Sequence, residues 1–331
     1  MEVRKSRARQ GRAEQPPHLV IENVTPELDC GRFPVKRIVG DVCVVAADIY
    51  KDGHDLLRAR ARFRGPSDAE WRYVPLAYDF PSDRWTGAIP LGEVGGWTFG
   101  IEAWTDAFAT WRDKLEKKVA AGQDVAVELL EGAALVEQSA RRVRFGEARR
   151  ALDRFAAAIR DKSAAAAQRA ELALSPELRD LMDAHGVPRD VTSYPRELTI
   201  TVDRERAGFA AWYELFPRSQ SPVPGRHGTF ADAARQLPRL AELGFDVVYL
   251  PPIHPIGRTF RKGPNNTLQS SPDDIGSPWA IGNECGGHTA VDPSLGTLED
   301  FSRFVCRANE LGLEVALDYA LQCSPDHPWV K

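Results

Sequence analysis

The sequence predicts a multidomain protein: a β-sandwich with an inserted α-helical domain, followed by the first three β/α units of a TIM (β/α)8 barrel. Alternating apolar and polar residues occur from about residue 19 to residue 106, and a long Ala, Arg, Glu and Leu rich block follows. Three short apolar runs then alternate with helical stretches, which is typical of parallel strands joined by right-handed crossovers. These runs are residues 211–216, 246–250 and 313–318. Because eight strands close such a barrel, the predicted barrel is incomplete.

Composition is that of an ordinary globular protein. The 331 residues suffice for two or three domains, and a net charge of -4 gives no electrostatic reason to expect nucleic acid or an anionic membrane as partner. The basic N-terminus is followed by no apolar segment of a secretory signal, and no apolar run of about 18 residues occurs. The five cysteines show no CxxC pairing, which argues against a zinc ribbon or a disulfide framework. We therefore expect a reduced, cytoplasmic protein.

The first domain is expected to be a small antiparallel sandwich behind a disordered tail. Residues 1–16 are polar and charged, as in disordered segments. Residues 17–107 and 190–207 carry strand patterns with a period of two, bounded by Gly, Pro and Asp. The strand pattern returns after about eighty helical residues, so we expect the helical block to be inserted in the sandwich.

Two sets of side chains in this domain allow a binding interpretation. Arginines alternate along one predicted strand and form either a polyanion-binding stripe or a solvated face. We favour the solvated face, because no aromatic side chain interleaves with the arginines on that face to stack bases. Tryptophans in the sandwich form either a sugar-stacking platform or part of the core, and we favour the core. The arginines are Arg58, Arg60, Arg62 and Arg64, and the tryptophans are Trp71, Trp85, Trp97 and Trp104.

The inserted block, residues 108–189, has helical spacing of its apolar residues. Ser175 followed by Pro176 predicts a helix start, and that helix is expected to end near His185. An all-helical insertion is either a dimer surface or a solvated outer face, and the sequence leaves both open.

The predicted barrel segment, residues 208–331, places its candidate site on loops. Thr229 precedes a helix expected to run to Leu243–Gly244, and Thr297 opens another with Asp300 as the capping-box partner. Between them, the loop 253–296 is long and has no periodicity, which is typical of functional or disordered loops. Chemistry in such barrels lies at the carboxyl ends of strands, so the loops after the second and third strands are the first candidates.

Several motifs in this segment carry a family resemblance. They are residues 213–219, 249–257, 261–266, 286–288, 295–297 and 316–329 (ALDYALQCSPDHPW). Together they resemble the α-1,4-glucan:maltose-1-phosphate maltosyltransferases, a family of the α-amylase superfamily (glycoside hydrolase family 13). The most specific element is residues 322–329, because Gln322 and Cys323 stand where general α-amylases have Asn and His.

The resemblance implies transfer of maltosyl units from α-maltose 1-phosphate to the non-reducing end of α-1,4-glucans, with retention of configuration and no cofactor or metal. It also implies a homodimer formed through the helical domain. Retention needs a nucleophile and an acid/base about 5 Å apart. In this superfamily they follow strands four and five, so the resemblance places no catalytic residue among these 331, and neither Asp318 nor Asp326 is assigned.

Donor-binding roles carry over from the family to Lys262, Gln322 and, more weakly, Asn266. Lysine offers a compact cation and glutamine an amide that donates to and accepts from sugar hydroxyls. The alternatives are a solvated loop lysine and a glutamine that caps local backbone. Asp318 and His288 are expected to have structural roles near the site, Asp318 by orienting its neighbours through hydrogen bonds. His254, His288 and His327 follow no metal-ligand spacing.

The sequence departs from the family pattern at Cys285, Thr289 and Asp292, where the resemblance implies Glu, Asp and His. The shape of the long loop is therefore expected to differ from that of relatives. Two further hypotheses remain beside the transferase: a non-catalytic glucan-binding or dimerisation module, and a fragment of an α-amylase-type hydrolase. The donor, maltose 1-phosphate or plain glucan, distinguishes the two enzymes.

Overall fold

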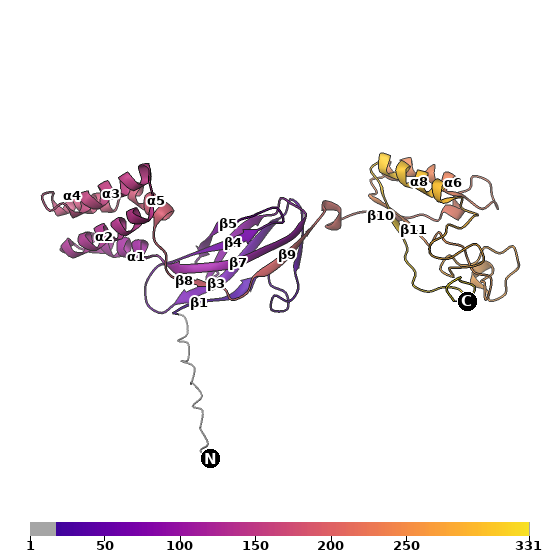
Figure 1. The fold of residues 1–331 in the computed structure, drawn as a ribbon, viewed down its shortest axis with the longest axis horizontal. Helices are drawn as coiled ribbons and strands as arrows, with labels where there is room; N and C mark the ends of the chain where they lie inside the picture. The colour runs from indigo at the N-terminus through magenta and orange to yellow at the C-terminus, as the bar shows by residue number, and fades with distance from the viewer. Residues whose placement is uncertain (1–17, 331) are drawn as a thin grey trace, which may run out of the picture. The chain divides into compact units, whose positions relative to one another are not determined.

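A computed structural model describes residues 18–330, so the predicted disordered tail lies outside the described residues. The chain divides into two compact units, Met1–Glu205 and Arg206–Lys331, and each is treated separately below (Figure 1). Within the described residues, no helix combines the length and apolar character needed to cross a membrane.

The first unit is built on a nine-stranded sheet. Its strand order is β1-β3-β6-β5-β4-β7-β9-β2, and β8 pairs with β7 beside this path. The strands are β1 (Leu19–Thr25), β2 (Val35–Ile38), β3 (Val42–Lys51), β4 (Leu57–Arg64), β5 (Arg72–Asp79), β6 (Arg84–Pro90), β7 (Gly95–Thr105), β8 (Arg189–Ser193) and β9 (Leu198–Asp203).

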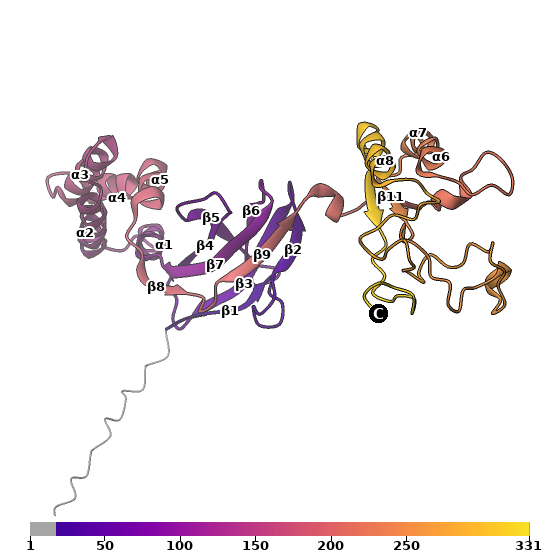
Figure 2. The same ribbon diagram turned by 45° about the vertical axis from the view of Figure 1, so that its right-hand side comes forward.

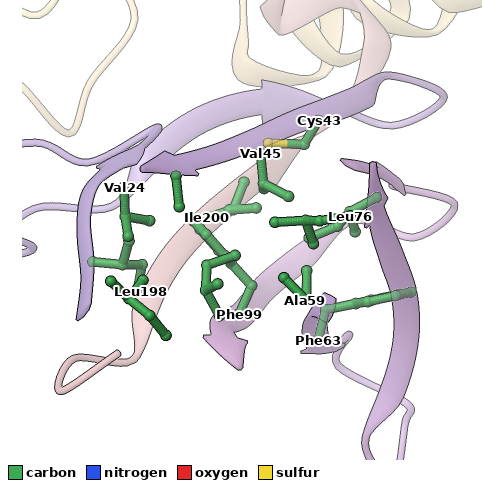
Figure 3. Close-up of a cluster of buried hydrophobic side chains, with 14 of the residues drawn as sticks. Val24, Cys43, Val45, Ala59, Phe63, Leu76, Phe99, Leu198 and Ile200 are labelled. Carbon is green, nitrogen blue, oxygen red and sulfur yellow. The ribbon is translucent and has the colours of Figure 1, made fainter. Parts of the chain in front are cut away.

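Alternation along these strands fills a single core. On β4, for example, Ala59, Ala61 and Phe63 are buried between more exposed arginines. Figure 3 shows such side chains, Val45 and Phe99 among them, gathered from several strands. They belong to one buried cluster, and burial of apolar area is the main term that stabilises this part of the sheet.

The predicted antiparallel sandwich is corrected in two respects. One sheet curls over its own core, because β5 pairs with β4 through residues 72–76 and with β6 through residues 77–79. Pro75, which has no N–H for the ladder, lies next to this change of partner. In addition, β2 pairs with β9 in parallel. A four-residue strand with a period of two does not specify the direction of its neighbour.

Three of the four arginines on the arginine face of β4 are half-buried and paired with carboxylates, and Arg64 is exposed. Arg60 contacts Glu102 of β7, and Arg62 contacts Glu197. Aromatic rings from outside β4 also lie against these arginines: Arg60 is 3.9 Å from the Tyr73 ring centroid, and Arg62 and Arg64 lie over Trp71. The sequence-based argument that no aromatic side chain lies among the arginines is therefore wrong, because neighbouring segments supply the rings.

The prediction of core tryptophans holds for one of the four. Trp97 is buried, at 3% exposure, and its indole N–H donates to the Glu93 carbonyl. Trp85 is half-buried and packs against the core cluster. Trp71 and Trp104 are half-buried on the arginine face, where arginines cover their rings.

Five helices lie between β7 and β8 in the chain. They are α1 (Ala107–Ala120), α2 (Ala126–Arg142), α3 (Glu147–Arg160), α4 (Ala166–Ala173) and α5 (Pro176–His185). The predicted cap of α5 is confirmed, since the Ser175 hydroxyl accepts from the Leu178 N–H. A separate buried cluster holds the helices together, and Trp111 of α1 donates to the Glu128 carbonyl of α2. Arg58 of the sheet binds both Asp106, the cap of α1, and Asp183 of α5.

The second unit has a three-stranded parallel sheet in the order β10-β11-β12, as expected for successive β/α units. Its elements are β10 (Trp212–Glu214), α6 (Phe230–Ala234), α7 (Leu237–Glu242), β11 (Val247–Leu250), α8 (Leu298–Glu310) and β12 (Glu314–Leu317). The predicted capping box at Thr297 with Asp300 is confirmed, and a second capping box forms at Thr229 with Asp232.

The single helix expected after Thr229 is instead two short ones. Pro238 lies in the first turn of α7, where its missing N–H costs nothing. Within a continuous helix its ring would clash with the carbonyl of Ala234. α6 therefore ends before it, and Gly244, at φ +83°, follows α7.

Candidate functional site

The carboxyl ends of the three parallel strands meet at one edge of the small sheet. Two long segments leave this edge, residues 251–297 after β11 and residues 318–330 after β12. In Figure 2 helices α6, α7 and α8 lie toward one end of the unit and these segments toward the other. The sequence-predicted site residues lie in the two segments, and Asp318 directly follows the end of β12.

The long segment is ordered by its own polar contacts rather than by helices or strands. Arg261 donates to three backbone carbonyls, those of Ile256, Gly257 and Asp274, at 2.8 to 2.9 Å. Asn283 donates to the same Ile256 carbonyl. One guanidinium therefore joins two distant parts of the segment and fixes the backbone next to Lys262.

A cavity of about 530 Å³ opens beside Lys262. Its lining is mostly polar and comes from the long segment and from Arg218, which follows β10. The lining residues are Arg218, Lys262, Gly263, Pro264, Asn265, Asn266, Asp273, Asp274, Ile275, Gly276, Ser277, Pro278 and Trp279. A cation, two amides and an indole suit a hydroxyl-rich ligand, because they supply donors, acceptors and one flat apolar face.

Arg218 contributes a second positive charge to this cavity. Its guanidinium donates to the Gly276 carbonyl at 3.0 Å and lies over the Phe216 ring. Burial lowers the pKa of Arg218, since water no longer fully solvates the charge. Even a lowered arginine pKa leaves the group charged near neutral pH.

Asp318 accepts hydrogen bonds at the strand end. The Trp279 indole N–H donates to its Oδ2 at 2.6 Å. A hydrogen bond from the Tyr249 hydroxyl to the same carboxylate raises the pKa of Tyr249. The carboxylate of Asp318 thus fixes an aromatic side chain of the cavity wall.

The carboxylate of Asp326 accepts hydrogen bonds from the long segment. Its Oδ2 accepts from the N–H groups of Arg258 and Thr259, at 2.7 and 2.6 Å, and its Oδ1 accepts from the Thr259 hydroxyl at 2.7 Å. The backbone N–H of Thr259, its hydroxyl and the N–H of Arg258 lower the pKa of Asp326 to about 2. This carboxyl therefore stays ionised at neutral pH.

The three histidines, far apart in sequence, form one group. The ring centroids of His254 and His288 are 5.6 Å apart, and those of His288 and His327 are 5.1 Å apart. The Trp329 N–H donates to His327 Nδ1, so in the neutral ring Nε2 carries the proton and donates to His288 Nδ1 at 3.0 Å. His288 Nε2 then donates to the Ala320 carbonyl.

Burial disfavours a positive charge on two of these rings, those of His254 and His327. Burial, together with the charges of His288 and His254, lowers the pKa of His327, and burial lowers the pKa of His254. His288 joins the two segments through its hydrogen bonds to His327 and to the Ala320 carbonyl. The structural role expected for His288 from the sequence stays a prediction.

The structure brings together only some of the residues predicted for the site. Lys262 and Asn266 line the cavity, whereas Gln322 is exposed and is not among the lining residues. Sequence reasoning missed Arg218 and Trp279, which face the cavity from outside the motif of Lys262. For Asn265 and Asn266 the sequence itself indicates a tight turn, because asparagine tolerates positive φ better than most residues. The two residues adopt φ of +54° and +62°.

The three family departures are not among the residues that line the cavity. Cys285 is exposed, and its N–H donates to Asn283 within a turn. Thr289 is exposed, and Asp292 accepts from the Ser294 N–H. Each side chain is compatible with its turn.

Comparisons with known proteins agree on one family. A family model described as alpha-1,4-glucan:maltose-1-phosphate maltosyltransferase, domain N/S, matches residues 17–204. The protein of that name from Myxococcus xanthus is 50% identical over 318 residues, which are 94% of this chain and 47% of that protein. The one from Chlorobaculum tepidum is 48% identical over 95% of this chain and 46% of that protein. The chain thus spans about half the length of these curated relatives.

Among solved structures, an α-amylase from Lactobacillus plantarum is similar to part of the chain. It is 37% identical and covers 36% of this chain and 24% of its own, with a TM-score of 0.29.

Proposed function

Because the chain belongs to the α-1,4-glucan:maltose-1-phosphate maltosyltransferase family, we propose that it forms part of an enzyme of α-glucan biosynthesis. The reaction is the transfer of maltosyl units from α-maltose 1-phosphate to the non-reducing end of α-1,4-glucans. Identity of 50% to a relative with this name, over 94% of the chain, is the observation that carries the proposal.

For the second unit we propose the start of a (β/α)8 barrel, with the candidate site at its carboxyl-terminal face. The parallel order of β10, β11 and β12 supports this, as do the intervening helices. The domain boundaries expected from the sequence stay a prediction: a sheet domain of 17–107 with 190–207, a helical insertion of 108–189, and the barrel from 208.

We propose that Lys262 and Asn266 bind the sugar part of the donor from the cavity, and that Gln322 reaches it from the segment after β12. A lysine ammonium offers three hydrogen-bond donors, and an amide both donates and accepts. Trp279, held by Asp318, supplies an apolar face against a sugar ring.

Retaining transfer requires a nucleophile and an acid/base about 5 Å apart. Asp318 and Asp326 are poor candidates, since each already accepts several hydrogen bonds from the protein. The pKa of Asp326 is lowered to about 2, so its carboxyl group stays ionised at neutral pH. Such a group suits neither proton donation nor proton uptake near neutral pH. We therefore propose that both catalytic carboxyl groups follow strands beyond β12.

Lys262→Ala and Gln322→Ala test the donor site in a complete enzyme that carries these 331 residues. Loss of a charge-assisted contact costs about 1.5 to 3 kcal/mol, so kcat/KM for maltose 1-phosphate should fall roughly ten- to a hundredfold. Lys162→Ala and Gln123→Ala, both exposed in the helical block, serve as matched controls. Unchanged kinetics in both site variants would show that the carried-over roles are wrong. Use of plain glucan as donor would instead favour a hydrolase.

We also propose a cytoplasmic homodimer formed through the helical block. The cysteines at positions 30, 43, 285, 306 and 323 are free, as expected in a reducing compartment. Apolar side chains are exposed on and beside α2, with Val127 at 65% and Phe145 at 88%. Residues 18–205 should give the mass of a dimer by light scattering at tens of micromolar. A measured mass of the monomer alone would contradict the proposed dimer.

A further inference from the structure

We propose that Asp326 is a positioning residue, whose carboxylate sets the place of residues 258–266 relative to the segment after β12. Lys262 belongs to the first stretch and Gln322 to the second, so the contacts of this side chain help to set their spacing. The inference deepens the proposed function and rests on it, because it concerns how two donor-binding residues are held for one ligand.

The contacts of Asp326 join it to residues 67 and 68 positions away through a single carboxylate. Two backbone N–H groups and one hydroxyl donate to it, and charge-assisted hydrogen bonds of this kind are about twice as strong as neutral ones. Asparagine in the same place would direct an N–H₂ group at one of these donors. The substitution therefore replaces attraction by repulsion while keeping the size of the side chain.

Close packing on both sides of Asp326 leaves it little freedom. Ser324 and His327 are 3% and 0% exposed, and each fits against glycines of the long segment. A Cβ at Gly257 would lie 2.0 Å from the Ser324 hydroxyl, and one at Gly287 would lie 2.0 Å from His327 Nε2. The two segments therefore pack closely against each other at the residues that flank Asp326 in the sequence.

The effect reaches Lys262 through three residues of chain. The carboxylate of Asp326 holds the backbone of Thr259. The guanidinium of Arg261 donates to the carbonyls of Ile256 and Gly257, which precede Thr259 in the chain. Residues 256–261 are thus held from both sides, and the next residue is Lys262 at the cavity wall. Release of Thr259 should loosen this arrangement and move the ammonium group.

The test compares Asp326→Asn with Asp300→Asn in the complete enzyme. Asp300 is a matched control, because it too accepts from a backbone N–H and a threonine hydroxyl, both of Thr297, but in the cap of α8. We expect Asp326→Asn to speed hydrogen exchange in residues 258–266 and to lower kcat/KM roughly ten- to a hundredfold, mainly through KM. Asp300→Asn should change neither quantity.

A double-mutant cycle separates positioning from general damage. If Asp326 acts through Lys262, Asp326→Asn combined with Lys262→Ala should be no slower than Lys262→Ala alone, within about threefold. Thr259→Ala, which removes only the hydroxyl contact, should give a smaller loss with the same dependence on Lys262, and it serves if Asp326→Asn does not fold.

Additive losses, or unchanged exchange in residues 258–266, would overturn the inference. If the unaltered enzyme does not use maltose 1-phosphate at all, the proposed function fails. The exchange comparison between the two aspartate variants then still decides whether Asp326 positions the loop.

Discussion

The two units differ in how completely their sheets are covered. In the first unit, Phe99 and Ile101 of β7 are 0% and 1% exposed within a closed cluster of inward-facing side chains. In the second unit only the central strand β11 is well buried, whereas Trp212 of β10 is 56% exposed and Leu317 of β12 is 42% exposed. The first sheet therefore buries its strands in its own core, whereas the outer strands of the second sheet remain largely exposed.

Limited proteolysis should expose this contrast as the largest effect. In the 331-residue chain, a resistant fragment ending near Val202 is expected, with digestion after Ala211. The uncovered face and the unpaired edge of β12 make the second unit prone to opening and to aggregation. Mass spectrometry of the fragments is the measurement, and a resistant, monodisperse segment 211–331 would break the comparison.

Gly132→Ala tests how tightly the helices of the first unit are packed. An added Cβ would lie 1.9 Å from Trp111 Cζ2 in the core of the helical block. Overpacking of this kind costs about 1 to 3 kcal/mol and should lower the thermal stability of the helices without affecting the second unit. Gly92→Ala is the control, because nothing lies within 4 Å of its Cβ position. Equal melting temperatures for both variants would mean that the helices are loosely packed.

Local signals carried most of what the sequence predicted. Caps at Ser175 and Thr297 were predictable because the capping residue and its partner are three positions apart. The curl of the sheet at β5 was not, since it depends on which distant strand each half of β5 meets. Pro238 did mark the break between α6 and α7, so that error lay in the interpretation and not in the signal.

The candidate site also contains both kinds of residue, those indicated by a local motif and those whose contacts are distant in the sequence. Lys262 and Asn266 were found through a short motif within one loop. Asp326 and His327 act on partners 39 to 68 residues away, which no periodicity or local spacing reveals. The tight fit of Gly257 and Gly287 against Ser324 and His327 likewise exists only in three dimensions.

Arg58→Ala gives a smaller effect, at the joint between the sheet and the helices. It leaves Asp106 and Asp183 without their shared cation. Because the guanidinium is 36% exposed, solvent screening limits the expected loss to about 1 kcal/mol. Chemical denaturation should report it for the first unit, and Arg64→Ala, on the same face, is the control. A loss equal to that of the control would show that Arg58 does not join the two parts.

Acid should produce the smallest effect, confined to the loops of the second unit. The pKa of Asp326 is lowered to about 2 in the folded state, against about 3.9 when unfolded. Its contribution to stability is therefore complete above pH 4 and lost as the pH falls toward 2. The difference in Tm between the unaltered complete enzyme and Asp326→Asn should shrink over that window, and a difference that stays constant down to pH 2 would contradict the assignment.

Maltosyl transfer is the most direct measure of the central claim, that this chain supplies donor-binding residues but not the catalytic carboxyl groups. Phosphate release from α-maltose 1-phosphate, with an α-1,4-glucan acceptor, should be measured for the purified 331-residue chain and for a complete enzyme that carries it. We expect turnover from the complete enzyme and none from the chain alone. Clear turnover by the chain alone, at verified mass, would contradict the account.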